Sequence, residues 1–340
     1  MEQWWKPYTA PDGLILREQV LTEGVDPDHL VVALRTGRMY RVQRGVYCAR
    51  AHPPTALGRA RAAVLSSGVL DAVASHQTAA RVHDLAVPDR PAAEHVTVRR
   101  EQRRIRRRDL HFHSRALALG DVELVGGVQL TSVARTVFDL CATLPRREAV
   151  WCVDDALRRG LLTRAQLRAT VEVRRGGPGE ARAAERIGQA DGLAESILET
   201  ASRLALADAQ VPLPVAQLEV HDADGRLIGR LDGGYPQLRL GLELDGRSVH
   251  SAPEAILRDR FRQNALEAAG WRVLRFTWWT WCTTPSASST PSVGRWPAPA
   301  PEHRAAARPG ETRVSGLVVV ADPAARSGWY LQTPHLPWGP

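Results

Sequence analysis

The sequence is short of lysine and cysteine, and it has no long hydrophobic run. Among its 340 residues, Lys6 is the single lysine, and the other 44 of the 45 basic side chains are arginines. The four cysteines form no Cys-x-x-Cys pair, which argues against a structural zinc site and predicts reduced, mostly buried thiols. No apolar run approaches the roughly 18 residues of a membrane span, and the N-terminus lacks the apolar core of a secretion signal. We therefore expect a cytoplasmic protein without a membrane partner.

Positively charged residues outnumber negatively charged ones in the sequence. The net charge is +8 and the isoelectric point is near 10.0, values typical of proteins that bind nucleic acid. The arginines accompany abundant alanine and glycine, which indicates a GC-rich genome. Codon bias therefore accounts for part of the positive charge, and the position of each arginine matters more than the total.

The first predicted domain covers 1–50. Two stretches with helical apolar spacing, 16–24 and 26–36, precede a basic hairpin at 39–49, and Asp26 is the expected N-cap of the second helix. This order predicts a winged helix-turn-helix whose second helix enters a major groove of DNA. The alternative is a small helical module for protein interaction. The predicted DNA-binding residues are Arg35, Arg38, Arg41 and Arg44.

The second predicted domain, 51–178, has an α/β pattern. Two predicted strands flank seven arginines between Arg99 and Arg108, and this run either binds nucleic-acid phosphate or forms a solvated hairpin loop. His111 and His113 alternate on one face of the second strand. Because no carboxylate or cysteine lies nearby at ligand spacing, we expect a surface pair here rather than a metal site.

Several segments of these two domains match one known architecture. They read GRMYRVQRGVYCA, SHQTAARVHDL and GGVQLTSVARTVFDLC, the last with Arg135, Thr136 and Asp139. Together they resemble the AbiEi-like antitoxins of type IV toxin–antitoxin systems. The resemblance implies a winged-helix DNA reader, an antitoxin-like middle domain and a cognate toxin as partner.

The third predicted domain, 186–279, carries a pattern of carboxylates. A helix with Glu195 near its start precedes a hairpin whose second strand ends in Asp232, and the next strand holds Glu243 and Asp245. Residues two apart on a strand point to the same face, so these carboxylates can converge. A helix and a buried-type strand complete an αβββαβ order. Carboxylate oxygens are the ligands that Mg²⁺ prefers, and a divalent ion assists phosphodiester hydrolysis.

The same stretch resembles the Vsr-like branch of the PD-(D/E)xK endonuclease superfamily. The matching segments are GRLDGGYPQLRLGLELDGRSVH, RDRFRQNAL and AAGWRVLRFT. The resemblance implies that Asp232 and Glu243 bind Mg²⁺ and that Glu195, Asp245 and His250 are further catalytic residues. It also implies supporting roles for Asp259 and Arg262. The lysine expected after the second acid is absent, and Asp245 stands in its place.

The sequence as a whole predicts a multidomain α/β protein. Its expected parts are an N-terminal winged helix-turn-helix, an α/β middle domain and a C-terminal restriction-endonuclease-like αβββαβ core. The leading functional hypothesis is a DNA-binding protein with a Mg²⁺-dependent endonuclease domain, acting in phage defence or DNA repair. The alternative is a non-catalytic transcriptional regulator or antitoxin with an inactive nuclease fold. A third hypothesis is a defence protein that acts on RNA, because phosphate contacts do not distinguish the two polymers.

The last predicted segment, 280–340, differs in composition from the rest. It is rich in proline, serine and tryptophan and has no periodicity, which predicts a tail of low order. Read one base earlier, with GC-ending codons, the stretch after Trp279 gives Asp-Val-Val-His-His-Pro-Glu-Arg-Val, which has helical amphipathic character. The hypothesis is that residues from about Thr280 are out of frame. The alternative is a genuine tail with tryptophan anchors.

Overall fold

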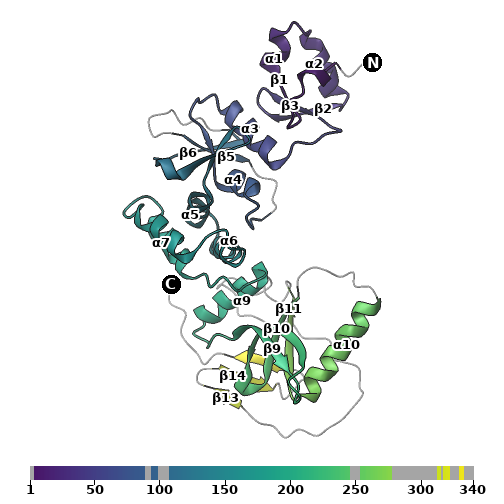
Figure 1. Cartoon of the computed structure of the whole chain (residues 1–340), viewed down its shortest axis with the longest axis vertical. Coiled ribbons are helices and arrows are strands. Elements are labelled where there is room, and N and C mark those ends of the chain that lie inside the picture. The colour runs from purple at the N-terminus through teal and green to yellow at the C-terminus, as the bar shows by residue number, and fades with distance from the viewer. Residues whose placement is uncertain are drawn as a thin grey trace. The chain divides into compact units, whose positions relative to one another are not determined.

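The computed structural model describes residues 4–88, 93–98, 107–245 and 253–277, and three short strands at 312–314, 317–321 and 329–332. The chain divides into two compact units, Met1–Gly192 and Leu193–Pro340. Both units combine helices with β-sheet, so the protein is of mixed α/β class (Figure 1). None of the helices within the described ranges is long and apolar enough to cross a membrane.

The first unit begins with two helices and a small antiparallel sheet. The predicted helices and hairpin are present, and an additional strand, β1, precedes them and pairs with β3 to give the order β1-β3-β2. Asp26 caps the second helix as expected, because its side chain accepts a hydrogen bond of 2.9 Å from the Asp28 N–H. The elements are η1 (Lys6–Tyr8), β1 (Leu14–Leu16), α1 (Arg17–Thr22), α2 (Pro27–Arg35), β2 (Met39–Gln43) and β3 (Val46–Ala49).

A five-stranded sheet follows in the order β6-β5-β4-β8-β7. The strand β6 runs parallel to β5, so the arginine-rich segment between them is a connection between parallel strands and the expected hairpin is wrong. A hairpin would have made the pair antiparallel. The elements are β4 (Val73–Ala74), β5 (Glu94–Val98), β6 (Leu110–Ser114), η2 (Leu119–Asp121), β7 (Val122–Val125) and β8 (Val128–Thr131).

Helix α3 (Ala56–Ser67) joins the small N-terminal sheet to the larger one. Two of its fully buried alanines lie on different sides: Ala60 packs against Val128 and Leu130, while Ala62 packs against Leu14 and Val46. Small side chains let both sheets approach the helix backbone closely. Helix α5 contacts the four helices that lie beside it in the sequence order α4 to α8. These helices are α4 (His76–Val82), α5 (Val133–Thr143), α6 (Arg146–Arg158), α7 (Arg164–Glu172) and α8 (Glu180–Gly188).

The second unit has the element order α9, β9, β10, β11, α10, β12, with η3 (Pro236–Leu238) between β10 and β11. Its sheet has the order β12-β11-β10-β9, in which β11 and β12 are parallel and the other pairs antiparallel. Helix α10 packs on β10 and β12, beside the sheet in Figure 1. The elements are α9 (Ile197–Asp208), β9 (Val215–His221), β10 (Leu227–Tyr235), β11 (Leu240–Asp245), α10 (Pro253–Ala268) and β12 (Arg272–Thr277).

The C-terminal segment contains an antiparallel sheet that the sequence analysis did not predict. It consists of β13 (Thr312–Val314), β14 (Leu317–Ala321) and β15 (Trp329–Gln332), with β14 in the middle. β-branched residues favour strands, and β14 reads Leu-Val-Val-Val-Ala. The rest of the predicted low-order tail, including Thr280, lies outside the described residues.

Candidate functional site

The predicted DNA-binding arginines lie at the end of α2 and in the β2–β3 hairpin. Arg35, Arg41 and Arg44 are exposed, and none forms an ion pair with a residue that the structure describes. Arg38 is different: its Nε donates to Thr36 Oγ1 at 3.1 Å, and its guanidinium carbon lies 5.9 Å from the centre of the Trp5 ring. The structure therefore leaves three of the four guanidinium groups directed to solvent, whereas Arg38 is partly used in packing.

The arginine run between β5 and β6 is mostly outside the described residues, which resume at Arg107. The Arg107 guanidinium is largely buried and pairs with Asp109 at 2.7 Å, and it donates to the Ser66 carbonyl at 2.7 Å. It also donates to Gln43 Oε1 at 3.1 Å, which ties the end of β2 to α3. Arg107 therefore stabilises the first unit and is not a free phosphate ligand.

Asp232 lies at the point where the β10–β11 ladder stops. The last paired residues are Gly233 and Leu242, and the Asp232 carboxylate instead accepts a hydrogen bond of 2.6 Å from the Leu244 N–H. Burial raises the pKa of Asp232, and the nearby carboxylates of Asp245 and Glu195 raise it further. The structure thus brings Asp232 near two of the predicted carboxylates, in a field that disfavours its negative charge.

Glu243 is held in an ion-pair network. Its carboxylate contacts Arg262 Nη2 at 2.5 Å and Arg275 Nε at 2.8 Å, and the residue is only 6% exposed. Asp259 pairs with the same two guanidinium groups, at 3.2 Å and 3.1 Å, and these groups lower its pKa. Arg262 and Arg275 therefore neutralise the charge of Glu243, and Asp259 binds the same two guanidinium groups. Both Glu243 oxygens are engaged in these ion pairs, and a Mg²⁺ ion bound to Glu243 would have to displace a guanidinium group.

The remaining predicted acids lie near the start of α9 and the end of β11. Glu195 is exposed and pairs with Arg230 at 2.8 Å, and Asp245 is exposed on β11. His250 lies outside the described residues. The sequence analysis missed Glu199, a half-buried acid that accepts hydrogen bonds from the Glu195 N–H and from Gln217 Nε2. Burial and the nearby Asp232 raise its pKa. The sequence feature that could have indicated Glu199 is Ser196, because a serine N-cap followed three residues later by a glutamate is typical of a helix start. In the structure, Ser196 accepts a hydrogen bond from the Glu199 N–H.

A cluster of histidines in the first unit is the second feature that the sequence did not predict. His76 at the start of α4, His95 on β5 and His113 on β6 place one ring nitrogen each within 4.8 Å of the others. Among the described residues, this is the only group of three or more histidine, cysteine or acidic side chains close enough to hold a metal ion. His111, the expected partner of His113, is outside this group. The sequence signal was present only as three histidines on separate elements.

The three rings contact one another closely. His95 Nδ1 and His113 Nε2 lie 2.9 Å apart, and the rings of His76 and His113 stack with their centres 3.5 Å apart. Burial, together with the neighbouring imidazoles, lowers the pKa of His95 to about 3 and that of His113 to about 4, and it lowers the pKa of His76 as well. All three imidazoles are therefore neutral at neutral pH.

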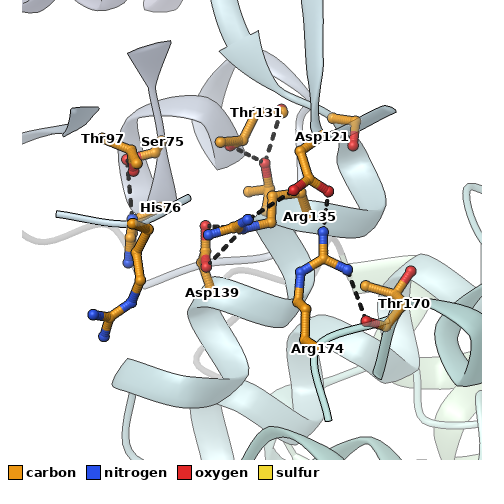
Figure 2. Close-up of polar contacts among 12 residues, drawn as sticks. Ser75, His76, Thr97, Asp121, Thr131, Arg135, Asp139, Thr170 and Arg174 are labelled. Carbon is orange, nitrogen blue, oxygen red and sulfur yellow. Dashed lines mark hydrogen bonds and ion pairs between the residues drawn. The ribbon is translucent and has the colours of Figure 1, made fainter. Parts of the chain in front are cut away.

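A buried polar network lies beside this cluster on α5 (Figure 2). The Arg135 guanidinium binds both carboxylate oxygens of Asp139 at 3.0 Å and Asp121 at 2.8 Å, and Arg174 also pairs with Asp121. Thr136 donates to the Thr131 carbonyl at 3.0 Å. Arg135, Thr136 and Asp139 are the residues of the antitoxin-like motif, and here they attach α5 to η2 and β8. Their role in the structure is to stabilise the domain.

Three cysteines are buried and free: Cys48, Cys141 and Cys152. Burial raises the pKa of Cys141 to about 12 and raises that of Cys152 as well. The burial of these cysteines agrees with the sequence-based expectation, and the raised pKa keeps the Cys141 and Cys152 thiols protonated at neutral pH. Cys282 lies outside the described residues.

Both units are therefore α/β folds, and no family model matches the chain. The chain is 32% identical over 248 residues to the uncharacterized proteins MT2308 and Rv2248 of Mycobacterium tuberculosis, and this match covers 72% of the chain and 88% of each relative. The chain belongs to the family of these two proteins. The solved structure of the RV2827C protein from Mycobacterium tuberculosis is similar over 62% of this chain and 83% of that chain, with 14% identity and a TM-score of 0.37.

Proposed function

We propose that this protein is a DNA-binding regulator whose N-terminal module holds duplex DNA. The observation that supports the proposal is the group of exposed guanidiniums at Arg35, Arg41 and Arg44, which have no ion-pair partner among the described residues. Elsewhere in the same unit, arginines such as Arg61 and Arg107 pair with a carboxylate. Unpaired guanidiniums gathered on a helix end and its adjoining hairpin suit the phosphates of a duplex.

The two ends of α2 differ in charge, and this difference suggests how the module meets DNA. Asp26 and Asp28 are exposed in the first turn of α2, whereas Arg35 lies in its last turn and Arg41 and Arg44 on the hairpin. Carboxylates repel phosphates, so the backbone contacts belong to the hairpin and to the C-terminal end of the helix. In this arrangement the proposed winged helix-turn-helix is anchored mainly through its wing.

The C-terminal domain fits the non-catalytic alternative better than a nuclease. A Mg²⁺ ion shared by Asp232 and Glu243 needs a free carboxylate on each, and Glu243 is neutralised by Arg262 and Arg275. We therefore propose that this αβββαβ domain is a nuclease-like scaffold without cleavage activity. The resemblance to AbiEi-like antitoxins further implies a cognate toxin as the partner of the regulator.

A Mg²⁺-dependent endonuclease is the second candidate function, because one observation favours it. The raised pKa of Asp232, next to Asp245 and Glu195, marks a group of carboxylates whose repulsion a bound cation would relieve. For this function, the ion pairs of Glu243 with Arg262 and Arg275 would have to break so that Glu243 can bind the metal ion.

DNA binding can be tested by fluorescence anisotropy of the full chain with a labelled duplex from upstream of its own gene, at several salt concentrations. Each phosphate contact adds about −0.9 to the slope of log K against log [salt]. We expect the double variant Arg41→Ala/Arg44→Ala to make this slope less negative by about 2. Arg175→Ala is the control, because Arg175 is an exposed arginine paired with Glu172 on α7.

An unchanged slope in the double variant, or an equal change in the control, would show that the hairpin is not the DNA contact. Tighter binding to an RNA of the same sequence would favour the RNA hypothesis instead.

Cleavage can be tested separately with plasmid and mismatched duplexes in the presence of Mg²⁺. We expect no cutting by the wild-type chain. Metal-dependent cutting that is lost in Asp232→Asn and Glu243→Gln would establish the endonuclease and overturn the non-catalytic assignment.

A further inference from the structure

We propose that His76, His95 and His113 bind one divalent transition-metal ion of the Zn²⁺ class. This site lies in the first unit, in the α/β domain that follows the proposed DNA-binding module. It is separate in sequence from the carboxylates of the second unit, and its ligands are imidazoles only.

The spacing of the ring nitrogens suits such an ion. Zn²⁺ binds histidine nitrogen at about 2.0–2.1 Å, so two ligands of a tetrahedral site lie about 3.4 Å apart. The His95 and His113 nitrogens are 2.9 Å apart, and all three ligand nitrogens lie within 4.8 Å of one another. Because the His76 and His113 rings are stacked and an imidazole lone pair lies in the plane of its ring, the His76 ring has to tilt for the three nitrogens to meet at one ion.

The hydrogen bond within the cluster also suits metal binding. The contact of 2.9 Å between His95 Nδ1 and His113 Nε2 requires one of these two nitrogens to lack a proton, so a lone pair already points into the cluster. One of the two now donates the hydrogen bond between them. On metal binding, the donor would carry its proton on its other ring nitrogen, and the cluster would stay neutral.

His76 is held in an unusual backbone conformation. Its φ is +50°, a region that residues other than glycine rarely adopt, and strained residues of this kind occur preferentially at functional sites. Ser75 Oγ lies 3.0 Å from His76 Nδ1 and accepts a hydrogen bond of 2.8 Å from Thr97 (Figure 2). Ser75, held by Thr97, therefore binds one ring nitrogen of His76, as outer partners do in known metal sites.

The ligand set selects the class of ion. Imidazole nitrogens suit Zn²⁺, Co²⁺, Ni²⁺ and Cu²⁺, whereas Mg²⁺ and Ca²⁺ need oxygen ligands. Among the nearby cations, Arg135 is neutralised by Asp121 and Asp139, and Arg81 by Glu94, so their charge opposes a bound ion only weakly. Arg115 also lies near His76 and His113, and its exposed charge is screened by solvent. Three histidines leave a fourth position for water or another ligand.

The test is a Co²⁺ titration of the untagged full chain, followed by Zn²⁺ competition. We expect one Co²⁺ per chain with the visible absorption of a four-coordinate ion, displaced by one equivalent of Zn²⁺. His95→Gln and His113→Gln should each weaken binding by more than about 100-fold, and Thr97→Val by about 10-fold, because loss of an outer partner costs about 10- to 100-fold. Circular dichroism checks that each variant is folded.

A matched control separates this site from other ligands. His221→Ala removes a half-exposed histidine of the second unit, and it should leave Co²⁺ affinity unchanged. The proposal is overturned if saturating Co²⁺ gives no four-coordinate spectrum. It is also overturned if folded His95→Gln and His113→Gln variants bind as tightly as the wild type.

Discussion

Replacement of Arg135 by methionine should strongly destabilise the first unit. Arg135 and Asp139 are each 4% exposed, and the guanidinium binds both oxygens of the Asp139 carboxylate. Asp121 keeps Arg174 as a partner in the variant, but Asp139 is left buried without a cation within contact distance among the described residues. Breaking a buried ion pair on one side costs about 3–5 kcal/mol, which we expect for Arg135→Met.

Hydrogen exchange of peptides from α5 is the appropriate assay, because it reports the unfolding of this unit separately from that of the second. A loss of 3–5 kcal/mol corresponds to exchange that is about 10²- to 10⁴-fold faster. The control is Arg158→Met, whose side chain is 38% exposed and pairs with Asp155, and it should cost less than about 1 kcal/mol.

The double variant Arg135→Met/Asp139→Leu leaves no orphaned carboxylate, so it should be more stable than Arg135→Met alone. A loss below about 1 kcal/mol in the single variant, or an equal loss in the double variant, would refute this reasoning.

The stability of the single variant Arg135→Met should depend on pH in a defined way. Burial raises the pKa of Asp139 above its ordinary value of 3.8 even when Arg135 is present, and removing the guanidinium raises it further. Between 3.8 and the raised folded value, the folded state binds more protons than the unfolded state, so stability falls as the pH rises. The destabilisation should therefore disappear below pH 3.8 and reach its full size once the pH exceeds the folded pKa.

Two further predictions concern helix α2 of the first unit and strand β10 of the second. Asp26→Ala removes the N-cap of α2 and should cost about 1 kcal/mol in exchange protection of that helix, whereas Asp26→Asn should retain it. Leu231→Ala on β10 empties a position that is 0% exposed and packed with Val220 and Leu266, and should cost about 2–5 kcal/mol in denaturant unfolding. Leu227→Ala on the same strand is 56% exposed and should change stability by less than about 0.5 kcal/mol; equal losses at both positions would contradict this packing.

Local sequence signals predicted the elements of the N-terminal module and of the sheet in the second unit. Asp26 and Pro27 mark the start of α2, and the alternation around Gly45 marks the hairpin, because capping and turn chemistry depend on neighbours in the chain. Strand direction did not follow from such signals. The pairing of β5 with β6 is parallel, and nothing in the arginine-rich connection itself determines that choice.

The carboxylates of the second unit also show that local spacing can be predicted from the sequence, whereas contacts between distant segments cannot. The spacing in β11 correctly placed Glu243 and Asp245 two apart on one strand, near Asp232 on its neighbour. It could not show that Arg262 and Arg275, from α10 and β12, close on Glu243, because these contacts join residues 19 and 32 positions away in sequence.

By itself, the sequence indicated the α/β class, the burial of the cysteines and the elements that carry Arg35, Arg41 and Arg44, since each depends on composition or on short-range pattern. Only the tertiary structure decided which charges are neutralised and which histidines meet. His76, His95 and His113 come together because α4, β5 and β6 pack side by side, and burial in that packing keeps their imidazoles neutral.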